Sequence, residues 1–507
     1  MRQPPPPGAA ATVVALLGFS LLRLLVWSVY AEPSGPLGTD PAIWGLTALD
    51  LAAGNPPLAV PLYPWLCGLA GRATGGLVEG GLAVSGLAAL LLPLAAWWAA
   101  RPLGGRAAAM AGSVVLLLPD PLVYAFQLQP DALTALWAVG LAGALLRERW
   151  ALIVPLAAIG LVLREHGGPV FGLVLIAAAV SRGSAAARGG RVLGLLGLGL
   201  GLAVALGGSV GVSQPWSARS GEAVGLLTTE VKPPHLKRGE WEAYREKGAV
   251  GRAVSHAERS LGLAPDGWIW IGVGVLVVGW RREPRLVLGM LPVAPVFGAL
   301  VVWSERRHVM VMAPVVVVIV SAGLFRFVKS NRDSGFAPPP KHHTLIITTL
   351  LALIALPLLR LPTEARRQRD ESAAFPPVQA VAERLCALAA PTDRLLTIDQ
   401  RLLLWCPLPQ LADPASPAAW RSWLVAPPGT VRPPWQPVDR SLGAVWIWRL
   451  EPDRSPRPCQ DTPDGARYLL ASGPTPHPAF VDIPLPGRPP ITLPPPDDCG
   501  DSRDLND

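Results

Sequence analysis

The residues best suited to chemistry in this chain follow its first membrane-length apolar run. Asp40 opens the segment Thr39-Asp40-Pro41-Ala42-Ile43-Trp44-Gly45, and the run Pro61-Leu62-Tyr63-Pro64-Trp65 comes later in the same polar stretch. An Asp followed by Pro is typical of a helix N-cap with proline at the first helical position. A helix N-terminus also keeps a carboxylate ionised. Asp40 therefore suits a cap, a general base at the membrane surface, or both.

The residues after Asp40 predict a helix that lies in the membrane interface. Ile43, Leu46 and Leu49 fall on one face of such a helix, which can therefore lie in the interface as an amphipathic helix. Tyr63, in the proline-containing run that follows, is a candidate for substrate binding. Both features predict that this segment covers a reaction site at the mouth of a membrane protein.

Two further carboxylates, Asp120 and Asp131, lie at the outer ends of the third and fourth apolar runs. Asp131 precedes an apolar run, so it is either a helix cap or part of the site. Asp40 with Asp131 could hold a divalent metal, although no ligand spacing demands one. Arg23, inside the first run, either extends outward to water or meets one of these carboxylates.

Two short outer connections carry unusual charge. Arg164-Glu165-His166 joins the fifth and sixth apolar runs, and Glu305-Arg306-Arg307-His308 joins the ninth and tenth. Ionisable groups at membrane depth are functional hypotheses, and the arginine fork suits bidentate phosphate binding. These arginines either bind a phosphate or pair with carboxylates such as Glu165, Glu305 and Asp131.

The outer residues together suit a transfer between a lipid-linked phosphate and a hydroxyl or amine. A carboxylate would accept the proton of the acceptor, and an arginine would stabilise charge on the departing phosphate.

Such chemistry requires a membrane-embedded scaffold. The 507 residues are 51% hydrophobic and only 16% charged, against about 25% charged in soluble domains.

We expect an all-α polytopic membrane unit over residues 1–360, with about eleven spans of the length that a bilayer requires. The apolar runs lie near 11–31, 80–99, 107–119, 132–146, 150–163, 169–181, 192–210, 267–280, 286–303, 309–325 and 344–360. Between them, the segments 32–79 and 211–266 are long enough to be large outer loops. The alternative for the first run is a cleaved signal peptide.

Positive charge in alternate loops predicts the orientation of these spans. Arginines and lysines gather in the loops that include Arg101, Arg147, Arg188, Arg285 and Lys329. The positive-inside rule makes these loops cytoplasmic, which places the C-terminal segment 361–507 outside. The net charge of +8 is therefore a topology signal, and no nucleic-acid partner is expected. We expect a multi-pass protein of a bacterial inner membrane, with its C-terminal unit in the periplasm.

The C-terminal unit has the pattern of a small α/β domain. Apolar residues at helical spacing between Val378 and Leu388 predict a helix, and the segments 394–398 and 444–448 predict strands. The Pro-rich end is predicted to be irregular.

Cysteine usage is concentrated in the same C-terminal unit. Four of the five cysteines fall there, namely Cys386, Cys406, Cys459 and Cys499. An oxidising compartment would allow disulfides among them. Free buried thiols are the alternative.

The order of the motifs resembles a known family. Asp40-Pro41-Ala42-Ile43-Trp44, then Asp50-Leu51-Ala52-Ala53-Gly54 and Pro61-Leu62-Tyr63-Pro64-Trp65, are similar to the first outer loop of GT-C type membrane glycosyltransferases. The protein O-mannosyltransferase and aminoarabinose transferase branch is the nearest in pattern. Pro130-Asp131-Ala132, Leu163-Arg164-Glu165 and Arg307-His308 resemble later landmarks of that family.

The resemblance implies a polyprenyl-phosphate sugar as donor, a glycan, lipid or protein acceptor, and Asp40 as general base. It also implies that the other candidate residues contribute to substrate binding, namely Tyr63, Asp131, Arg164, Glu165, His166, Arg306, Arg307 and His308. Two alternatives stay open. A transporter or flippase for a lipid-linked sugar would use a similar membrane scaffold, and Pro41, where the family usually has Glu, permits an inactive member that acts as an assembly scaffold.

Overall fold

The structure is a computed structural model of the 507-residue chain. It describes residues 9–31, 44–51 without 46 and 50, 61–205 without 119, 165 and 166, and a set of shorter segments. These are 246, 284–293, 311–321, 361–366 without 364, 378–390, 393–396, 402–406, 422–426, 436–441 and 446–450.

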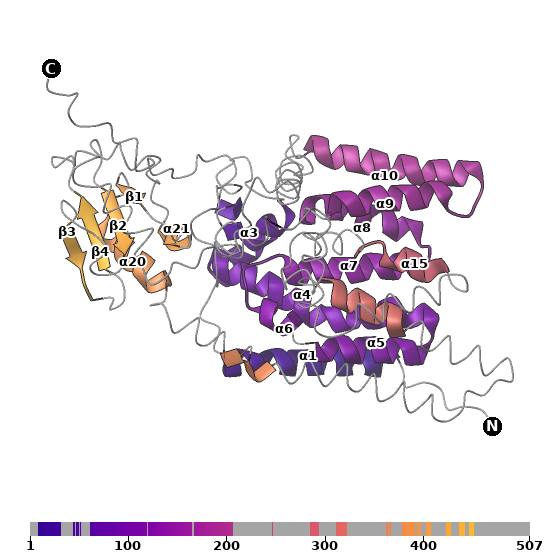
Figure 1. Cartoon of the computed structure of the whole chain (residues 1–507), viewed down its shortest axis with the longest axis horizontal. Helices are drawn as coiled ribbons and strands as arrows, with labels where there is room; N and C mark the ends of the chain where they lie inside the picture. The colour runs from indigo at the N-terminus through magenta and orange to yellow at the C-terminus, as the bar shows by residue number, and fades with distance from the viewer. Residues whose placement is uncertain are drawn as a thin grey trace, which may run out of the picture.

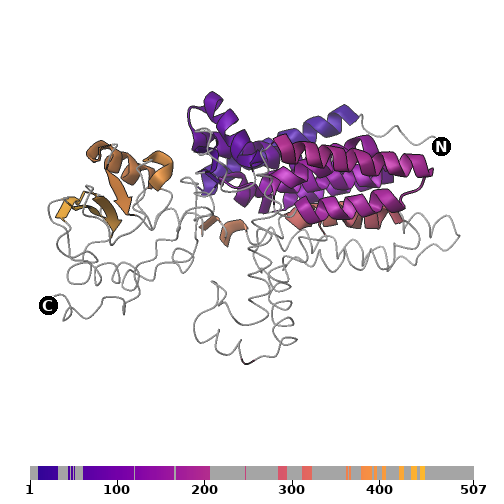
Figure 2. The same cartoon turned by 90° about the horizontal axis from the view of Figure 1, so that it is seen from above.

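Long helices lying side by side dominate the described part of the chain (Figures 1 and 2). In chain order they are α1 (Ala9–Ala31), α3 (Leu62–Thr74), α4 (Leu77–Ala100), α5 (Gly105–Leu117), α6 (Asp120–Ala125), α7 (Asp131–Leu146), α8 (Trp150–Leu163), α9 (Gly167–Val180), α10 (Ala185–Ala205) and α15 (Pro284–Met290), with a further helix over Val311–Ser321. The 3-10 turn η1 (Arg101–Leu103) joins α4 to α5.

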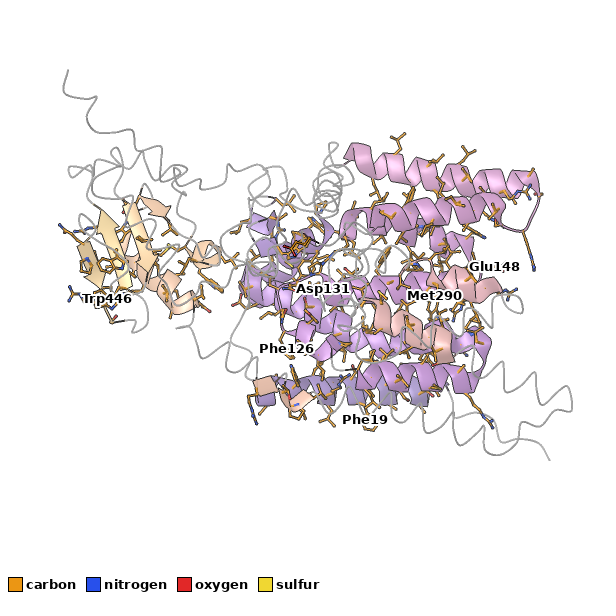
Figure 3. All side chains as sticks on the ribbon, in the orientation of Figure 1. Phe19, Phe126, Asp131, Glu148, Met290 and Trp446 are labelled. Carbon is orange, nitrogen blue, oxygen red and sulfur yellow. A yellow bond between two sulfur atoms is a disulfide. The ribbon has the colours of Figure 1, made fainter. Side chains whose placement is uncertain are left out.

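Most of the described helices overlap apolar runs in the sequence, although α10 begins seven residues before its run. The runs 267–280 and 344–360 lie outside the described residues, so the number of spans stays a prediction. Two described helical segments, Ala10–Val29 and Leu77–Leu103, have the length and hydropathy of a membrane span. Five shorter apolar helices accompany them, including Asp131–Leu146 and Trp150–Leu163. A backbone in lipid must satisfy its hydrogen bonds internally, which favours helices. The outward side of α1 carries large exposed apolar residues such as Phe19, which Figure 3 labels at the edge of the bundle.

Helices α4 and α7 form the centre of the bundle. α4 packs against α1, α3, α5, α6 and α7, and most of α7 is buried. Small residues allow α3 and α4 to approach closely. A side chain at Gly80 would lie 2.3 Å from the backbone nitrogen of Gly71. This close contact holds the first polar segment of the chain against the central helix.

Helix α3 was not predicted, because the sequence reading treated 32–79 as one outer loop. Pro61 occupies the N-cap of α3 and Pro64 lies in its first turn, where proline costs no helical hydrogen bond. The structure also starts α4 at Leu77, inside the range expected for that loop. The segment 211–266 lies outside the described residues, apart from residue 246.

The C-terminal part contains the predicted helix and both predicted strands. Helix α20 (Val378–Leu388) and the short α21 (Leu402–Trp405) accompany a sheet of four strands, β1 (Arg394–Leu396), β2 (Ser422–Ala426), β3 (Gln436–Asp439) and β4 (Trp446–Leu450). The strand order is β1-β2-β4-β3. β1 and β2 are parallel, and β4 is antiparallel to β2 and β3. The sequence analysis missed β2 and β3. Figures 1 and 2 place this sheet beside the end of the bundle that carries α3.

A disulfide joins Cys386 of α20 to Cys406, directly after α21, with Cα atoms 5.4 Å apart. The expectation of at least one disulfide among the C-terminal cysteines is therefore confirmed. Cys459 and Cys499 lie outside the described residues. The two cysteines are 20 positions apart in the sequence. A disulfide that closes a loop of that size typically stabilises the folded state by about 3 kcal/mol.

We expect thiol labelling of the denatured, unreduced protein to detect no more than three of the five cysteines, because one disulfide removes two. The Cys386→Ser variant removes one cysteine of the bridge and frees the other, so the number of labelled cysteines should rise by one, with Cys406 as the additional reactive thiol. Labelling of all five wild-type cysteines, counted by intact mass, would contradict the bridge.

An ion pair connects α20 to β3. The guanidinium of Arg384 donates to Asp439, and Ser441 donates to the same carboxylate through its hydroxyl at 2.6 Å and its backbone N–H at 2.8 Å. The hydrogen bond from Arg384, followed by those from Ser441, lowers the pKa of Asp439 to about 2. Arg384 itself is half exposed, so water screens part of this interaction.

Because the pKa of Asp439 is lowered on folding, its contribution to stability is complete above an ordinary pKa of about 3.9 and is lost as the pH falls towards 2. We expect Asp439→Asn to destabilise the sheet by about 1 kcal/mol at pH 7, with faster amide hydrogen exchange in α20 and β3. The difference in stability between Asp439→Asn and wild type should shrink as the pH falls from about 4 to 2. Glu383→Gln, on the exposed side of α20, is the matched control, and an equal effect of both changes would reject the prediction.

Candidate functional site

A buried ion pair forms the centre of the candidate site. Asp131 is the first residue of α7, and Arg164 follows the last residue of α8. One Asp131 carboxylate oxygen lies 3.2 Å from a guanidinium nitrogen of Arg164, and the two side chains are 1% and 4% exposed. The pairing that the sequence left open for Arg164 is therefore present. Charges buried this deeply require such a partner.

The helix-cap interpretation of Asp131 was wrong. Pro130 occupies the N-cap of α7, and Asp131 stands one position inside the helix. Its carboxylate still lies in the first turn, where the helix dipole favours negative charge. Figure 3 shows Asp131 at the end of the bundle near α3, whereas Glu148 lies at the other end.

The backbone around Arg164 is shaped by a tight connection between α8 and α9. Arg164 is extended, and its N–H donates to the carbonyl of Gly160. Gly167, the first residue of α9, lies so close to Gly160 that an added Cβ would be 1.7 Å from its carbonyl oxygen. Glycine is therefore required at Gly167 by this close approach. The connection turns the Arg164 side chain towards the start of α7.

An aromatic residue from the first polar segment lies beside Arg164, and a second one packs against it. The Arg164 guanidinium carbon lies 5.8 Å from the ring centroid of Trp44, a distance within the range of a cation–π interaction. Trp44 meets Tyr63 edge to face, with ring centroids 6.0 Å apart. Residues 44, 45 and 47–49 are helical, which agrees with the predicted helix after Asp40. Trp44 and Ala48 are buried in the core.

A chain of hydrogen bonds connects Tyr63 to the segment before Asp131. The Tyr63 hydroxyl lies 2.9 Å from the Ser85 hydroxyl, which donates to the Gln129 carbonyl at 3.0 Å. Either hydroxyl can be the donor in the first bond, because the Tyr63 hydroxyl also has the carbonyl of Gly81 as an acceptor, at 3.3 Å. Burial, with a smaller effect of nearby Cys67, raises the pKa of Tyr63 well above its ordinary value. The phenol therefore stays protonated and acts as a donor.

Cys67 lies one helical turn after Tyr63 and is also buried. Burial raises the pKa of its thiol to about 12. A thiol in this state is a poor nucleophile because the thiolate is the reactive form. Cys67 is therefore a packing residue.

The structure brings together only part of the predicted site. Asp131, Arg164 and Tyr63 gather at one end of the bundle, and Trp44 and Ser85, which the sequence analysis did not select, complete the cluster. Trp44 was visible in the motif that begins at Asp40, but Ser85 had no sequence signal. The other candidates lie outside the described residues, namely Asp40, Glu165, His166, Arg306, Arg307 and His308.

Two further sequence expectations concern Arg23 and a metal. Arg23 of α1 donates a hydrogen bond to the backbone carbonyl of Leu118, at the end of α5. Among the residues that the structure describes, no group of three or more His, Cys, Asp or Glu side chains is arranged to hold a metal ion. Asp40 is not among those residues, so the metal site stays a prediction.

This helical architecture is the GT-C membrane fold. The chain is similar to ArnT, the aminoarabinose transferase from Cupriavidus metallidurans, in the apo state, with a TM-score of 0.56 and 15% identity over 88% of this chain and 99% of ArnT. The structure of ArnT bound to undecaprenyl phosphate matches with the same TM-score and identity over 87% of this chain and 98% of ArnT. The predicted resemblance is thus confirmed for the fold. No family model and no curated protein matches the sequence.

Proposed function

We propose that this protein is a membrane glycosyltransferase that moves a sugar from a polyprenyl-phosphate donor to an acceptor. The observation that carries the proposal is the likeness to ArnT over nearly the whole of both chains, because one of the matching structures is ArnT bound to undecaprenyl phosphate. The buried Asp131–Arg164 pair at the end of the bundle supports it, since ionisable groups at membrane depth are functional-site hypotheses and arginine suits phosphate binding.

The proposed reaction is a single displacement with inversion. The acceptor oxygen or nitrogen attacks the anomeric carbon, the bond from that carbon to the phosphate oxygen breaks, and the polyprenyl phosphate leaves. Asp40 accepts the acceptor's proton. Arg307, with Arg306 and His308, stabilises the charge on the departing phosphate.

The contacts of Arg164 and Trp44 support these roles. Trp44 is four positions after Asp40, and an extended chain covers at most about 14 Å over that length. The Trp44 ring in turn lies beside Arg164, which Asp131 holds in place. Arg164 and the adjacent Glu165 and His166 would then contribute to the donor site, with Asp131 and Tyr63 fixing the position of the cluster.

The reaction is proposed for the extracytoplasmic side of a bacterial inner membrane, in the cell envelope. The charged loops support this orientation, and the C-terminal sheet lies beside the bundle end that carries α3 and Asp131. We expect alkaline phosphatase, fused after Asp507, to be active, and a reporter that works only in the cytoplasm to be silent there. The same reporters fused after Arg188 should show the opposite result. Cytoplasmic activity after Asp507 would overturn the orientation.

The test of the function is transfer of label. The purified full chain is incubated with a radiolabelled polyprenyl-phosphate sugar and a membrane extract, and label in lipid, glycan and protein fractions is counted. We expect label to move into one of these fractions. A flippase would move labelled donor across a vesicle membrane without transfer, and an inactive scaffold would do neither, so both of these results would reject the enzyme.

A further inference from the structure

A groove without polar side chains lies between α1, α4 and α7, far from the candidate site. Its volume is about 430 Å³, and α4 supplies most of its lining, from Leu91 to Trp98, with Val13 of α1 and Leu136 of α7. The stretch from Leu91 to Trp98 extends about 10 Å along the helix axis, at 1.5 Å per residue. Ser85, in the candidate site, is thirteen residues before Trp98, or about 20 Å away along α4.

Two arginines lie over the tryptophans that close one end of this groove. The guanidinium carbon of Arg101 is 5.4 Å from the ring centroid of Trp97, and that of Arg147 is 3.9 Å from the ring centroid of Trp98. Tryptophan and arginine together are typical of the level of lipid headgroups at the membrane interface. The groove thus passes from an apolar channel to a cationic end.

The cationic end has more positive than negative charge in the part of the chain that the structure describes. Burial, followed by the neighbouring cations Arg149 and Arg101, lowers the pKa of Arg147 to about 10. The nearby carboxylate of Glu148 pairs with Arg285, at 3.1 Å. The cluster of arginines is therefore not neutralised by Glu148.

The two arginines at the groove have different roles. Arg147 donates to the carbonyls of Gly143, Ala99 and Trp98 and so ties the ends of α4 and α7 together. Arg101 is exposed, and its guanidinium carbon lies 5.4 Å from the Trp97 ring centroid. A guanidinium beside an aromatic ring can still donate its N–H groups to an anion. Arg101 is thus the residue through which a ligand would be bound.

We propose that this groove binds an anionic glycerophospholipid of the membrane, with one acyl chain between α1, α4 and α7 and the phosphate at Arg101. The apolar lining matches an acyl chain, and the charge of the arginines is complementary to the phosphate. Basic pockets between membrane helices on the cytoplasmic side are a known way to hold anionic headgroups. The predicted cytoplasmic position of the loops with Arg101 and Arg147 agrees with this leaflet.

The test is lipid retention by the full-length protein in detergent, measured by native mass spectrometry. Phosphatidylglycerol and phosphatidylcholine with identical acyl chains are titrated separately. We expect wild type to retain phosphatidylglycerol about fivefold better than phosphatidylcholine, the factor that one basic residue contributes at an anionic lipid. Arg101→Ala should lose most of this preference. Arg101→Lys should keep a large part of it.

A second variant tests the groove itself. Ala95→Phe places a ring where the acyl chain would lie, so it should reduce the retention of both lipids. Arg72→Ala removes an exposed arginine from α3, at the other end of the bundle, and is the matched control. Equal retention of the two lipids by wild type, equal effects of Arg101→Ala and Arg72→Ala, or unchanged retention in Ala95→Phe would each overturn the proposal.

Discussion

Asp40→Asn is expected to reduce sugar transfer by about 10²–10⁴-fold, the usual contribution of a general base. The amide cannot accept the acceptor's proton, but it has nearly the size of the carboxylate and is also a good helix cap. The protein should therefore accumulate and bind donor as wild type does. Transfer is measured with the radiolabelled polyprenyl-phosphate sugar, and donor affinity is measured separately on the purified variant.

Asp50→Asn is the matched control for this change. Asp50 belongs to the same polar segment but is ten residues further along, which corresponds to about 15 Å in a helix. We expect a change of less than a few-fold in transfer. A folded Asp40→Asn protein with near-normal transfer would remove Asp40 from the mechanism, and Asp131 would become the next candidate base.

The second large effect is expected from the buried ion pair. Asp131→Asn and Arg164→Ala should each lower the free energy of unfolding by about 3–5 kcal/mol, because each leaves the other charge buried without its partner. The double variant Asp131→Leu/Arg164→Met should regain most of this loss, since it removes both charges and keeps apolar volume. Unfolding is followed in detergent by the loss of tryptophan fluorescence.

Arg72→Ala, at an exposed position of α3, is the control for this series and should change stability by less than about 0.5 kcal/mol. Single variants as stable as this control would show that the pair contributes little. Arg164→Lys then separates structure from donor binding. Lysine keeps the charge but not the planar fork, so a folded Arg164→Lys protein should bind donor about tenfold more weakly if Arg164 also contacts the phosphate.

The long helices could be predicted from the sequence because lipid leaves few alternatives. The runs 132–146 and 150–163 correspond to Asp131–Leu146 and Trp150–Leu163 with a difference of at most one residue. An apolar run in a bilayer must form its own hydrogen bonds, so its length nearly decides its structure. The helix Val378–Leu388 was found in the same way, from apolar residues at helical spacing.

Elements that depend on their neighbours were missed. β2 and β3 are stabilised by β4, which pairs with both, and strand preference is largely a matter of such contacts. Helix α3 was missed because the segment 32–79 was interpreted as one outer loop, whereas Pro61 and Pro64 lie at the start of a helix. Only its packing against α4 shows that both prolines lie at its start.

For the candidate site, the sequence by itself determined the types of the chemical groups and their place near the membrane surface. Asp131 and Arg164 were selected because ionisable residues are rare next to apolar runs. Their partnership was decided by tertiary structure, because α7 and α8 must pack before residues 33 positions apart can lie 3.2 Å from each other. The same holds for Trp44 and Ser85, whose roles come from contacts with Arg164, Tyr63 and Gln129. Composition and spacing along one segment cannot specify such contacts, since they are properties of the packed bundle.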